Sequence, residues 1–505
     1  MKHLRHDEPI QQNGGAAPAL AFLIACFVLC IAPFLCMSFA ATNESAEKKE
    51  LAEPPSLLVD GSPNIFVLSD AGAYFNDHFA FRNELVDLNA LLKQSLLMTS
   101  ATDRVIVGSD GWLFYDGTRD DYQRTNLMSD RALFNAAHNV MIVQRFAESN
   151  GCTFALAIAP NKNTLYPDHM PYFLLAGTRQ GNFDRFETIA REMGINLVDL
   201  KQPLSDASSI LYYKTDSHWT NEGARIASEV LFDALGHAAS SLEGTATHMI
   251  DHLGDVATML RPLSSKPEAD VEYEGAQAFT YLTGETVEDN TIETTSTSDS
   301  SHGTLVAYRD SFGNALLPYL ASEYKNAYFS KLMPYDMGLV VQKGADSVLM
   351  ERAERHLSSL ATTPPYLYSP RAQDQVQEFE TKLDSGGLMT ARINGPYLQI
   401  GGYVDDGLLE DDSTILLQVS VDGQAVGTYD CFLVSSQLEE VSDVAGAGEP
   451  GSDEVVGDGG YRAFLQASQF TEVMDRVRLR LIRLSQGEYV CVMDEALQNV
   501  FVDVQ

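Results

Sequence analysis

Residues 304–324 read TLVAYRDSFGNALLPYLASEY. Residues 304–308 form a compact apolar run typical of a buried strand, and the residues after Gly313 are typical of a helix. A strand that passes directly into a helix through a turn indicates a parallel sheet covered by helices on both faces. The turn carries Asp310 and Ser311, so polar side chains fall at the carboxyl end of a strand, where such sheets bind their ligands.

The same alternation of strands and helices runs upstream. Helical spacing of apolar residues predicts helices over 131–149, over 183–193 and after Thr220. Compact apolar strands are expected between them at 153–160 (TFALAIAP) and 195–200 (INLVDL). The sequence therefore predicts an α/β domain with a parallel sheet flanked by helices.

The boundaries of this domain follow from changes in composition. It is expected to span 57–361, with a variable surface insertion at 263–303 that is rich in Ser, Thr, Glu and Asp. Residues 362–394 are a breaker-rich connector. Short β-branched and aromatic runs with turn signals such as Asp422-Gly423 then predict a C-terminal β-sandwich over 395–505.

The N-terminal part carries a long apolar stretch. Residues 16–41 contain no charged side chain and exceed the roughly 20 apolar residues that cross a bilayer. Lys2 and Arg5 precede the stretch, which favours an inside-to-outside orientation. We therefore expect a cytoplasmic tail at 1–15, a single transmembrane helix at 16–41 and a polar linker at 42–56.

A cleaved signal peptide is the alternative for this stretch. Ser38 and Ala40 fit a small-residue cleavage site. The apolar core of a signal peptide usually has about 7–15 residues, and the greater length here favours an uncleaved anchor. Both interpretations predict that the folded domains lie outside the cytoplasm, at the cell membrane.

Charge and cysteine content exclude several classes of partner. The 34 basic and 70 acidic residues give a formal net charge of −36. Nucleic acid is not an expected partner, because phosphate binding depends on a positive surface. Outside the apolar stretch only Cys152, Cys431 and Cys491 occur, without a C-x-x-C pair, and no D-x-D-x-D-G loop is present. A disulfide framework and a structural zinc site are therefore not expected, with a single Cys431–Cys491 bridge as the alternative. No cofactor is expected.

Two short motifs contain the residue types needed for nucleophilic catalysis. A hydroxyl nucleophile needs a neutral imidazole beside it, and the imidazole needs a carboxylate that fixes its tautomer. Asp216 and His218 lie on one predicted loop, and Ser311 lies on the strand-to-helix turn. The alternative for each is a structural role: a histidine beside a helix start is commonly a surface or capping residue, and Asp-Ser before a helix is commonly an N-cap.

The order of the motifs resembles a known family. Asp216-Ser217-His218-Trp219-Thr220 stands upstream of Arg309-Asp310-Ser311-Phe312-Gly313. Further matching stretches are Tyr74–Phe79 with Phe81-Arg82, Val107–Tyr115, Pro160-Asn161-Lys162 with Tyr166-Pro167, and Leu253-Gly254-Asp255. In this pattern the chain resembles the SGNH hydrolase-like proteins of polysaccharide O-acetylation, the AlgX/AlgJ type, and their DHHW relatives, over residues 65–360.

The resemblance implies a Ser-His-Asp site on an SGNH-like fold. Ser311 would be acylated, His218 would act as general base and then acid, and Asp216 would orient His218. The backbone N–H of Phe312 is the expected oxyanion donor. Asn161 and Arg309 are further candidates for oxyanion or substrate contacts, although each could equally fix a loop. Arg309 stands where many such proteins have glycine.

The expected activity is that of an extracytoplasmic, serine-dependent O-acetyltransferase acting on a cell-surface or exported polysaccharide. The resemblance implies a membrane-bound O-acyltransferase (MBOAT) as the partner that supplies acyl groups. A carbohydrate esterase and a non-catalytic glycan-binding envelope protein are the alternatives. The acidic surface disfavours a strongly anionic acceptor such as alginate and favours a neutral or amino-sugar polymer.

Overall fold

The computed structural model describes residues 16–40, 51–59, 62–97, 100–238, 244–263, 265–299, 301–372, 376, 378–381, 387–435 and 457–502. The chain divides into two compact units. One consists of Met1–Val107 with Leu253–Pro267, and the other of Gly108–His252 with Glu268–Gln505. The expected cytoplasmic tail at 1–15 and residues 42–50 of the expected linker lie outside the described residues.

The first unit is mainly helical. Its elements are α1 (Ala16–Ala40), β1 (Leu58–Val59), β2 (Ser62–Pro63), α2 (Val67–His78), α3 (Arg82–Leu97), β3 (Val105–Val107) and α10 (Asp255–Leu260). The segment of α10 packs against α3, and the Leu263 N–H donates to Asp87 Oδ1 at 3.2 Å. Residues far apart in the sequence thus form one unit.

The anchor expected at 16–41 falls on α1. A helix with the length and hydropathy needed to span a bilayer is not found among the described residues. Several side chains of α1, including those of residues 16–19 and 38–40, lie outside the description, as does residue 41. The transmembrane anchor is therefore not confirmed and stays a prediction.

A seven-stranded sheet forms the centre of the second unit. Its strand order is β6 (Leu197–Val198), β5 (Thr153–Ala159), β13 (Ser347–Ala353), β11 (His302–Tyr308), β12 (Tyr324–Ser330), β10 (Thr291–Ser296) and β9 (Phe279–Thr283). The first five strands are parallel, β10 pairs antiparallel with β12, and β9 pairs antiparallel with β10 at the edge of the sheet. The predicted α/β architecture is confirmed in this part of the chain.

The stretch 263–303 is more than the surface insertion that the sequence predicts. It supplies β8 (Glu268–Tyr273), β9 and β10, and β10 pairs with the central strand β12. In β10 the buried positions are Ile292, Thr294 and Ser296. Only one of these is strongly apolar, so the alternation that marks a half-buried strand is weak in the sequence.

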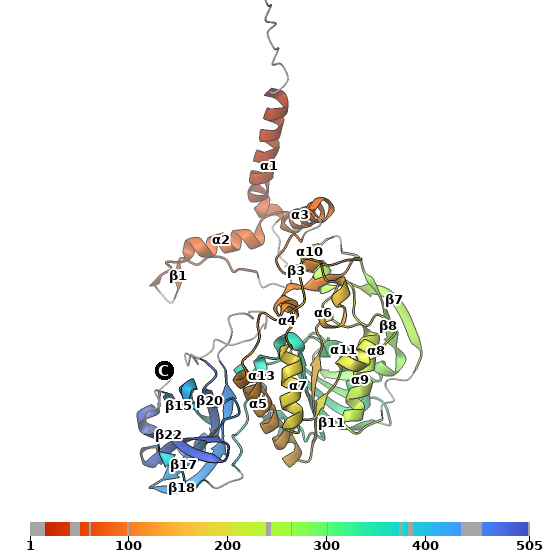
Figure 1. Cartoon of the computed structure of the whole chain (residues 1–505). Coiled ribbons are helices and arrows are strands. Elements are labelled where there is room, and N and C mark those ends of the chain that lie inside the picture. The colour runs from red at the N-terminus through yellow and green to blue at the C-terminus, as the bar shows by residue number, and fades with distance from the viewer. Residues whose placement is uncertain are drawn as a thin grey trace, which may run out of the picture. The chain divides into compact units, whose positions relative to one another are not determined.

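Helices cover both faces of the sheet (Figure 1). Helices α5 (Asp130–Ser149) and α7 (Asn182–Glu192) cover one face, and α8 (Lys201–Asp206), α9 (Asn221–Ala234) and α11 (Gly313–Glu323) cover the other. Strand β5 shows how one strand serves both cores. Phe154, Leu156 and Ile158 point to α5 and α7, whereas Ala155, Ala157 and Ala159 point to α9 and α11.

Local signals place the helix starts. The Ser129 hydroxyl accepts from Ala132 N at 2.9 Å and caps α5, and Thr220 accepts from Gly223 N at 3.1 Å and caps α9. The remaining short elements of this part are β4 (Leu113–Tyr115), α4 (Arg119–Gln123), α6 (Lys162–Leu165), β7 (Ala246–His252), α12 (Gly338–Gln342) and α13 (Ser359–Thr362).

The C-terminal part is a sandwich of two sheets. One has the order β14 (Glu380–Thr381), β22 (Glu488–Ala496), β21 (Val477–Ser485), β17 (Thr414–Val421) and β18 (Gln424–Asp430). The other has the order β15 (Leu388–Asn394), β16 (Tyr397–Tyr403), β20 (Gly460–Gln466) and β19 (Phe432–Val434). The short helix α14 (Leu497–Val500) follows β22. Asp422 and Gly423, with φ of 51° and 78°, form the expected hairpin turn between β17 and β18.

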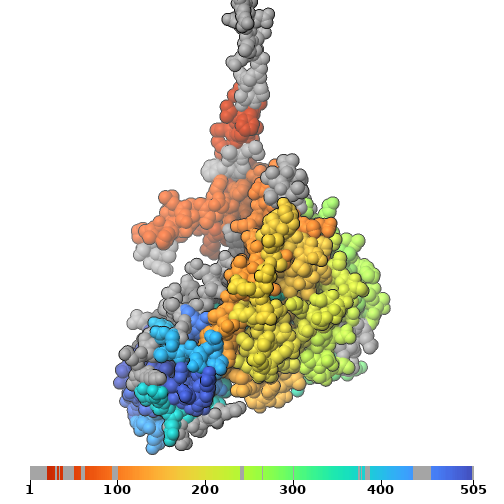
Figure 2. Space-filling model, in the orientation of Figure 1, coloured from red at the N-terminus to blue at the C-terminus, as the bar shows by residue number. Residues whose placement is uncertain are grey.

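Buried polar contacts join the sandwich to α5. Figure 2 shows the sandwich, in blue and cyan, beside the α/β part of this unit, in orange and yellow. The Asn139 side chain donates to Leu360 O and Leu433 O at 2.9 and 2.8 Å and accepts from Leu433 N at 2.9 Å. His138 Nε2 donates to Cys431 O at 3.1 Å. The sandwich therefore belongs to the same compact unit as the α/β domain, and β15 extends it into the expected connector at 362–394.

Asn139→Ala should destabilise this junction. The substitution leaves two carbonyls and one N–H without their partner in a buried site, so we expect a loss of about 3 kcal/mol in the free energy of unfolding. Urea titration of the purified chain measures it. Arg145→Ala, at an exposed position of the same helix, is the control and should change stability by less than about 0.5 kcal/mol. Equal effects of the two substitutions would contradict this account of the junction.

Candidate active site

Ser311 lies in the tight turn between β11 and α11. Helix α11 begins at Gly313, directly after the Phe312 N-cap. A side chain at Gly313 would come within 2.7 Å of Arg309 Cβ and 3.0 Å of Glu351 Oε2, so the turn requires glycine. The arrangement places the hydroxyl of Ser311 at the positive end of an 11-residue helix.

Asp216, His218 and Ser311 form one hydrogen-bonded chain. His218 Nε2 lies 2.8 Å from Ser311 Oγ, and His218 Nδ1 lies 2.7 Å from Asp216 Oδ1. The same carboxylate oxygen accepts from the backbone N–H of His218 at 2.9 Å. A carboxylate only accepts, so Nδ1 carries the proton and Nε2 is left to accept from the Ser311 hydroxyl. The Asp216 side chain is 6% exposed and that of His218 is 22% exposed.

Asp216 carries the negative charge that it needs to accept the hydrogen bond from His218 Nδ1. Burial alone would raise its pKa, but the charges and hydrogen bonds of His218 and His252 hold the pKa of this carboxyl well below its usual range. The second oxygen, Oδ2, accepts from His252 Nε2 at 3.0 Å. Asp216 is therefore an anion wherever the imidazole of His218 can act as a base.

Trp219 connects the histidine loop to the serine turn. Its indole N–H donates to the carbonyl of Phe312 at 3.1 Å, and its ring meets the Phe312 ring edge-on at 5.0 Å. The His218 imidazole packs on the same phenyl ring at 4.8 Å. Trp219 is 1% exposed and Phe312 is fully buried. The separation of His218 from Ser311 is thus set by a packed aromatic cluster.

Lys162 secures the backbone before His218. Its ammonium donates to the carbonyls of Tyr213 and Lys214 at 3.1 Å and to that of Asp216 at 2.6 Å. The residue is 3% exposed, and its Nζ lies 5.1 Å from the ring centroid of Phe114. The Pro160-Asn161-Lys162 stretch is one of the matching sequence motifs. Its contact with residues 213–216 joins segments about 50 residues apart in the chain, so the sequence alone does not predict it.

The Asp310 side chain links the turn that carries Ser311 to the end of β13 and to His356. Oδ1 accepts from Phe312 N at 3.0 Å, and Oδ2 accepts from Ala353 N at 2.8 Å and from His356 Nδ1 at 2.9 Å. Burial alone would raise the pKa of Asp310, but the hydrogen bond from His356 and the charges of Arg352 and Arg355 hold it well below its usual range. Burial lowers the pKa of His356 to about 4, so its imidazole is neutral and donates Nδ1–H.

Two of the expected oxyanion or substrate contacts are engaged elsewhere. The N–H of Phe312, the expected donor, is bonded to Asp310 Oδ1. The side-chain amide of Asn161 donates to Asp121 Oδ2 at 3.1 Å, and the residue is fully buried. In this arrangement the Phe312 N–H and one N–H of the Asn161 amide each donate to a buried carboxylate.

Arg309 also serves a loop. Its guanidinium donates to the carbonyls of Val287 and Asp289 at 2.9 and 3.1 Å and to the Asn314 side chain. It therefore fastens the turn between β9 and β10 to the start of α11. The structure brings Asp216, His218 and Ser311 together. The assignment of Phe312, Asn161 and Arg309 to oxyanion or substrate contacts stays a prediction.

Three further residues near Asp216 were missed by sequence reasoning. His252, at the end of β7, and Glu268 and Asp270, on β8, all contact the 213–218 loop or the start of α9. Glu268 and Asp270 lie in the stretch read as a variable insertion. No local pattern signals their role, because each contact depends on how β7 and β8 pair.

The comparisons with known proteins agree with the resemblance. Residues 105–298 match the family model described as an SGNH hydrolase-like domain, acetyltransferase AlgX. The chain is 28% identical over 202 residues to the probable alginate O-acetylase AlgJ of Pseudomonas syringae, covering 38% of this chain and 49% of that protein. The chain thus spans about half the length of this curated relative.

Solved structures show more distant similarity. The O-acetyltransferase domain of Pseudomonas putida AlgJ aligns over 50% of this chain and 92% of that chain, with 19% identity and a TM-score of 0.34. A DHHW family protein from Eubacterium siraeum aligns over 50% of this chain and 97% of that chain, with 14% identity and a TM-score of 0.38. The family-model match therefore shows that residues 105–298 of this chain are similar to the SGNH hydrolase-like domain of the AlgX type.

Proposed function

We propose that this chain is an extracytoplasmic, serine-dependent O-acetyltransferase that modifies a cell-surface or exported polysaccharide. The observation that carries the proposal is the hydrogen-bonded chain from Asp216 through His218 to Ser311. It lies where a parallel sheet binds its ligands. Asp216 and His218 fall within the residues that match an acetyltransferase model, and Ser311 lies beyond the end of that match. The three residues have the types, order and distances that activate a hydroxyl nucleophile.

The proposed reaction has two displacements. Ser311 Oγ attacks the carbonyl carbon of an acetyl donor while His218 Nε2 takes the hydroxyl proton. The donor's leaving group departs with that proton and leaves acetyl-Ser311. An acceptor hydroxyl then attacks the acetyl carbon as His218 takes its proton, and Ser311 leaves and is reprotonated by His218. Asp216 stabilises the imidazolium in both halves.

Stabilisation of the oxyanion is assigned to the positive end of α11. Ser311 precedes the N-cap of this helix, whose first N–H groups lack intrahelical acceptors. A charge that develops on the acyl oxygen beside Ser311 therefore meets a favourable field. This assignment stands beside the donors expected from the sequence.

The proposed partners follow from the family resemblance and from the charge of the chain. An MBOAT at the membrane would supply acetyl groups, and a single N-terminal anchor would keep the catalytic domain on the outer side. The net charge of −36 opposes a polyanionic acceptor, so a neutral or amino-sugar polymer is favoured. The relative from Pseudomonas syringae is named for alginate, so the acceptor is the feature in which this chain is expected to differ.

A serine-directed fluorophosphonate should label the purified chain at Ser311. Ser311→Ala should abolish labelling, and Asp216→Asn should slow it by about 10³–10⁴-fold because the imidazole would adopt the wrong tautomer. Mass spectrometry of the digest locates the adduct. Ser205→Ala, at an exposed position of α8, should label like wild type. Absence of labelling in folded wild-type protein would contradict catalysis and favour the glycan-binding role.

Transfer and hydrolysis differ in the acceptor. With p-nitrophenyl acetate as donor, oligosaccharides with neutral or amino sugars should gain acetyl groups, detected by mass spectrometry, and Ser311→Ala should produce none. Alginate oligomers should be acetylated less, because the acidic protein repels them. Release of acetate without an acetylated product for any acceptor would identify an esterase instead.

A further inference from the structure

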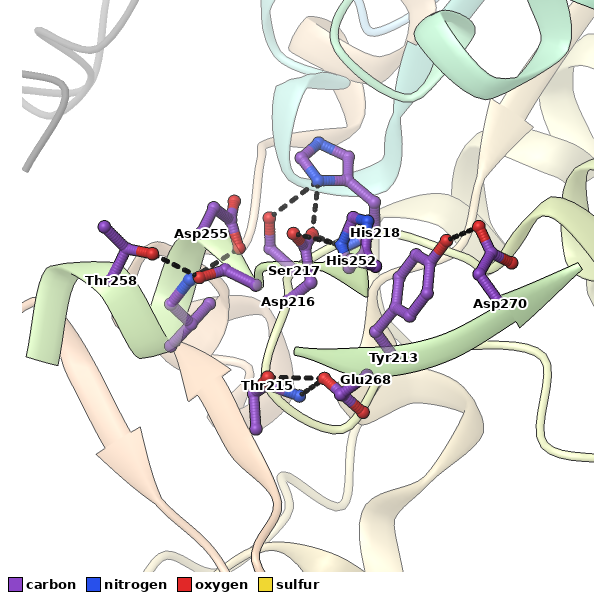
Figure 3. Close-up of polar contacts among 12 residues, drawn as sticks. Tyr213, Thr215, Asp216, Ser217, His218, His252, Asp255, Thr258, Glu268 and Asp270 are labelled. Carbon is purple, nitrogen blue, oxygen red and sulfur yellow. Dashed lines mark hydrogen bonds and ion pairs between the residues drawn. The ribbon is translucent and has the colours of Figure 1, made fainter. Parts of the chain in front are cut away.

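Strands β7 and β8 form an antiparallel ribbon beside the catalytic loop. The pairing sets His252 opposite Glu268, and Asp270 lies two residues further along β8. Figure 3 shows these side chains beside Asp216, His218 and Tyr213, with dashed contacts to the loop. The ribbon therefore brings one histidine and two carboxylates to the residues that precede the helix α9.

We propose that His252 is a positioning residue of the active site, and that as an imidazolium it holds Oδ2 of Asp216 while Oδ1 serves His218. This inference rests on the proposed function, because its effect reaches the reaction only through His218 and Ser311. It assigns a role to a residue outside the Asp-His-Ser chain.

The contact with Asp216 fixes the orientation of the carboxylate. His252 Nε2 lies 3.0 Å from Oδ2, while Oδ1 accepts from His218 Nδ1 and from the His218 backbone. A carboxylate is acceptor-only, so His252 carries a proton on Nε2. With donors on both oxygens, rotation of the carboxylate about its bond to Cβ breaks at least one charge-assisted hydrogen bond.

Tyr213 holds the His252 ring in place. The two rings are stacked, with centroids 3.6 Å apart and planes 5° from parallel. The phenol of Tyr213 donates to Asp270, which also accepts from the side chain of Asn221 at 2.7 Å and from its backbone N–H at 3.2 Å. A cation over the face of an aromatic ring is favoured, so this stack suits an imidazolium.

The charged and titratable groups around His252 favour its protonated form. They are Asp216 and His218 on the loop, Tyr213 before it, and Glu268 and Asp270 on β8. Burial alone would lower the pKa of His252, but the hydrogen bond and charge of Asp216, with Asp270 and Glu268, raise it above its usual value. The imidazolium therefore persists to higher pH than that of an unperturbed histidine.

A cation on the far side of Asp216 has a defined effect on His218. The imidazolium of His252 disfavours a second positive charge, that of protonated His218, beside the same carboxylate. In the proposed arrangement His218 therefore stays neutral to a lower pH than it would without His252. Removing the charge of His252 should make protonation of His218 easier. The acid limb of the pH–rate profile should then move to higher pH.

The deciding experiment is the pH dependence of fluorophosphonate labelling of Ser311 in the full chain. His252→Gln keeps a side-chain donor but loses the charge; we expect its acid limb to shift upward by about one pH unit, with a plateau near that of wild type. His252→Ala also loses the donor, and its plateau should fall by about tenfold because Asp216 can rotate. His248→Gln, at an exposed position of the same strand, is the matched control and should follow wild type.

The outcomes separate the two claims. A purely structural role of His252 would lower the labelling rate of His252→Gln equally at all pH values without moving the acid limb, and that result would overturn the inference. The test does not depend on whether His252→Ala folds well, because His252→Gln is the deciding variant. Profiles of His252→Gln that superimpose on wild type would overturn it too. Failure of folded wild-type protein to label would instead overturn the proposed function, and the inference with it.

Discussion

The buried carboxylate of Asp216 is the constraint on which the site depends. An ionised carboxylate that is 6% exposed is stable only when hydrogen-bond donors replace its water. Here the donors come from His218, from the His218 backbone and from His252, and the ammonium of Lys162 binds the carbonyl of the same residue. The carboxylate of Asp216 thus joins its own loop to the β7–β8 ribbon, and its backbone carbonyl joins the loop to Lys162.

A second buried carboxylate, that of Asp310, fixes the turn that carries Ser311. Asp310 gathers donors from the turn itself, from the end of β13 and from His356, and so fixes the backbone on which Ser311 stands. The hydrogen bond from Trp219 to Phe312 joins the two halves. The distance between His218 and Ser311 is therefore defined by two anionic anchors and the aromatic cluster between them, and the hydroxyl and imidazole need little adjustment before reaction.

The sequence predicted what depends on local pattern. The helix after Thr220, the hairpin at Asp422-Gly423 and the apolar strand β5 follow from residue type and spacing, and the structure has them. It did not predict β10 as a sheet strand, because Thr and Ser occupy two of its buried positions. The contacts of His252 and Lys162, and the use of the Phe312 N–H by Asp310, depend on pairings between distant segments, which no single-sequence pattern encodes.

The order of the motifs in the chain has a structural reason. Asp216 and His218 precede α9, and Ser311 precedes α11, 93 residues beyond His218. These two helices pack against each other on one face of the sheet, and both start at the edge where the parallel strands end (Figure 1). Two adjacent helix starts bring their preceding loops together whichever comes first in the chain. The geometry of the site is therefore set by the neighbouring helices and not by the order of the two loops or the length of chain between them.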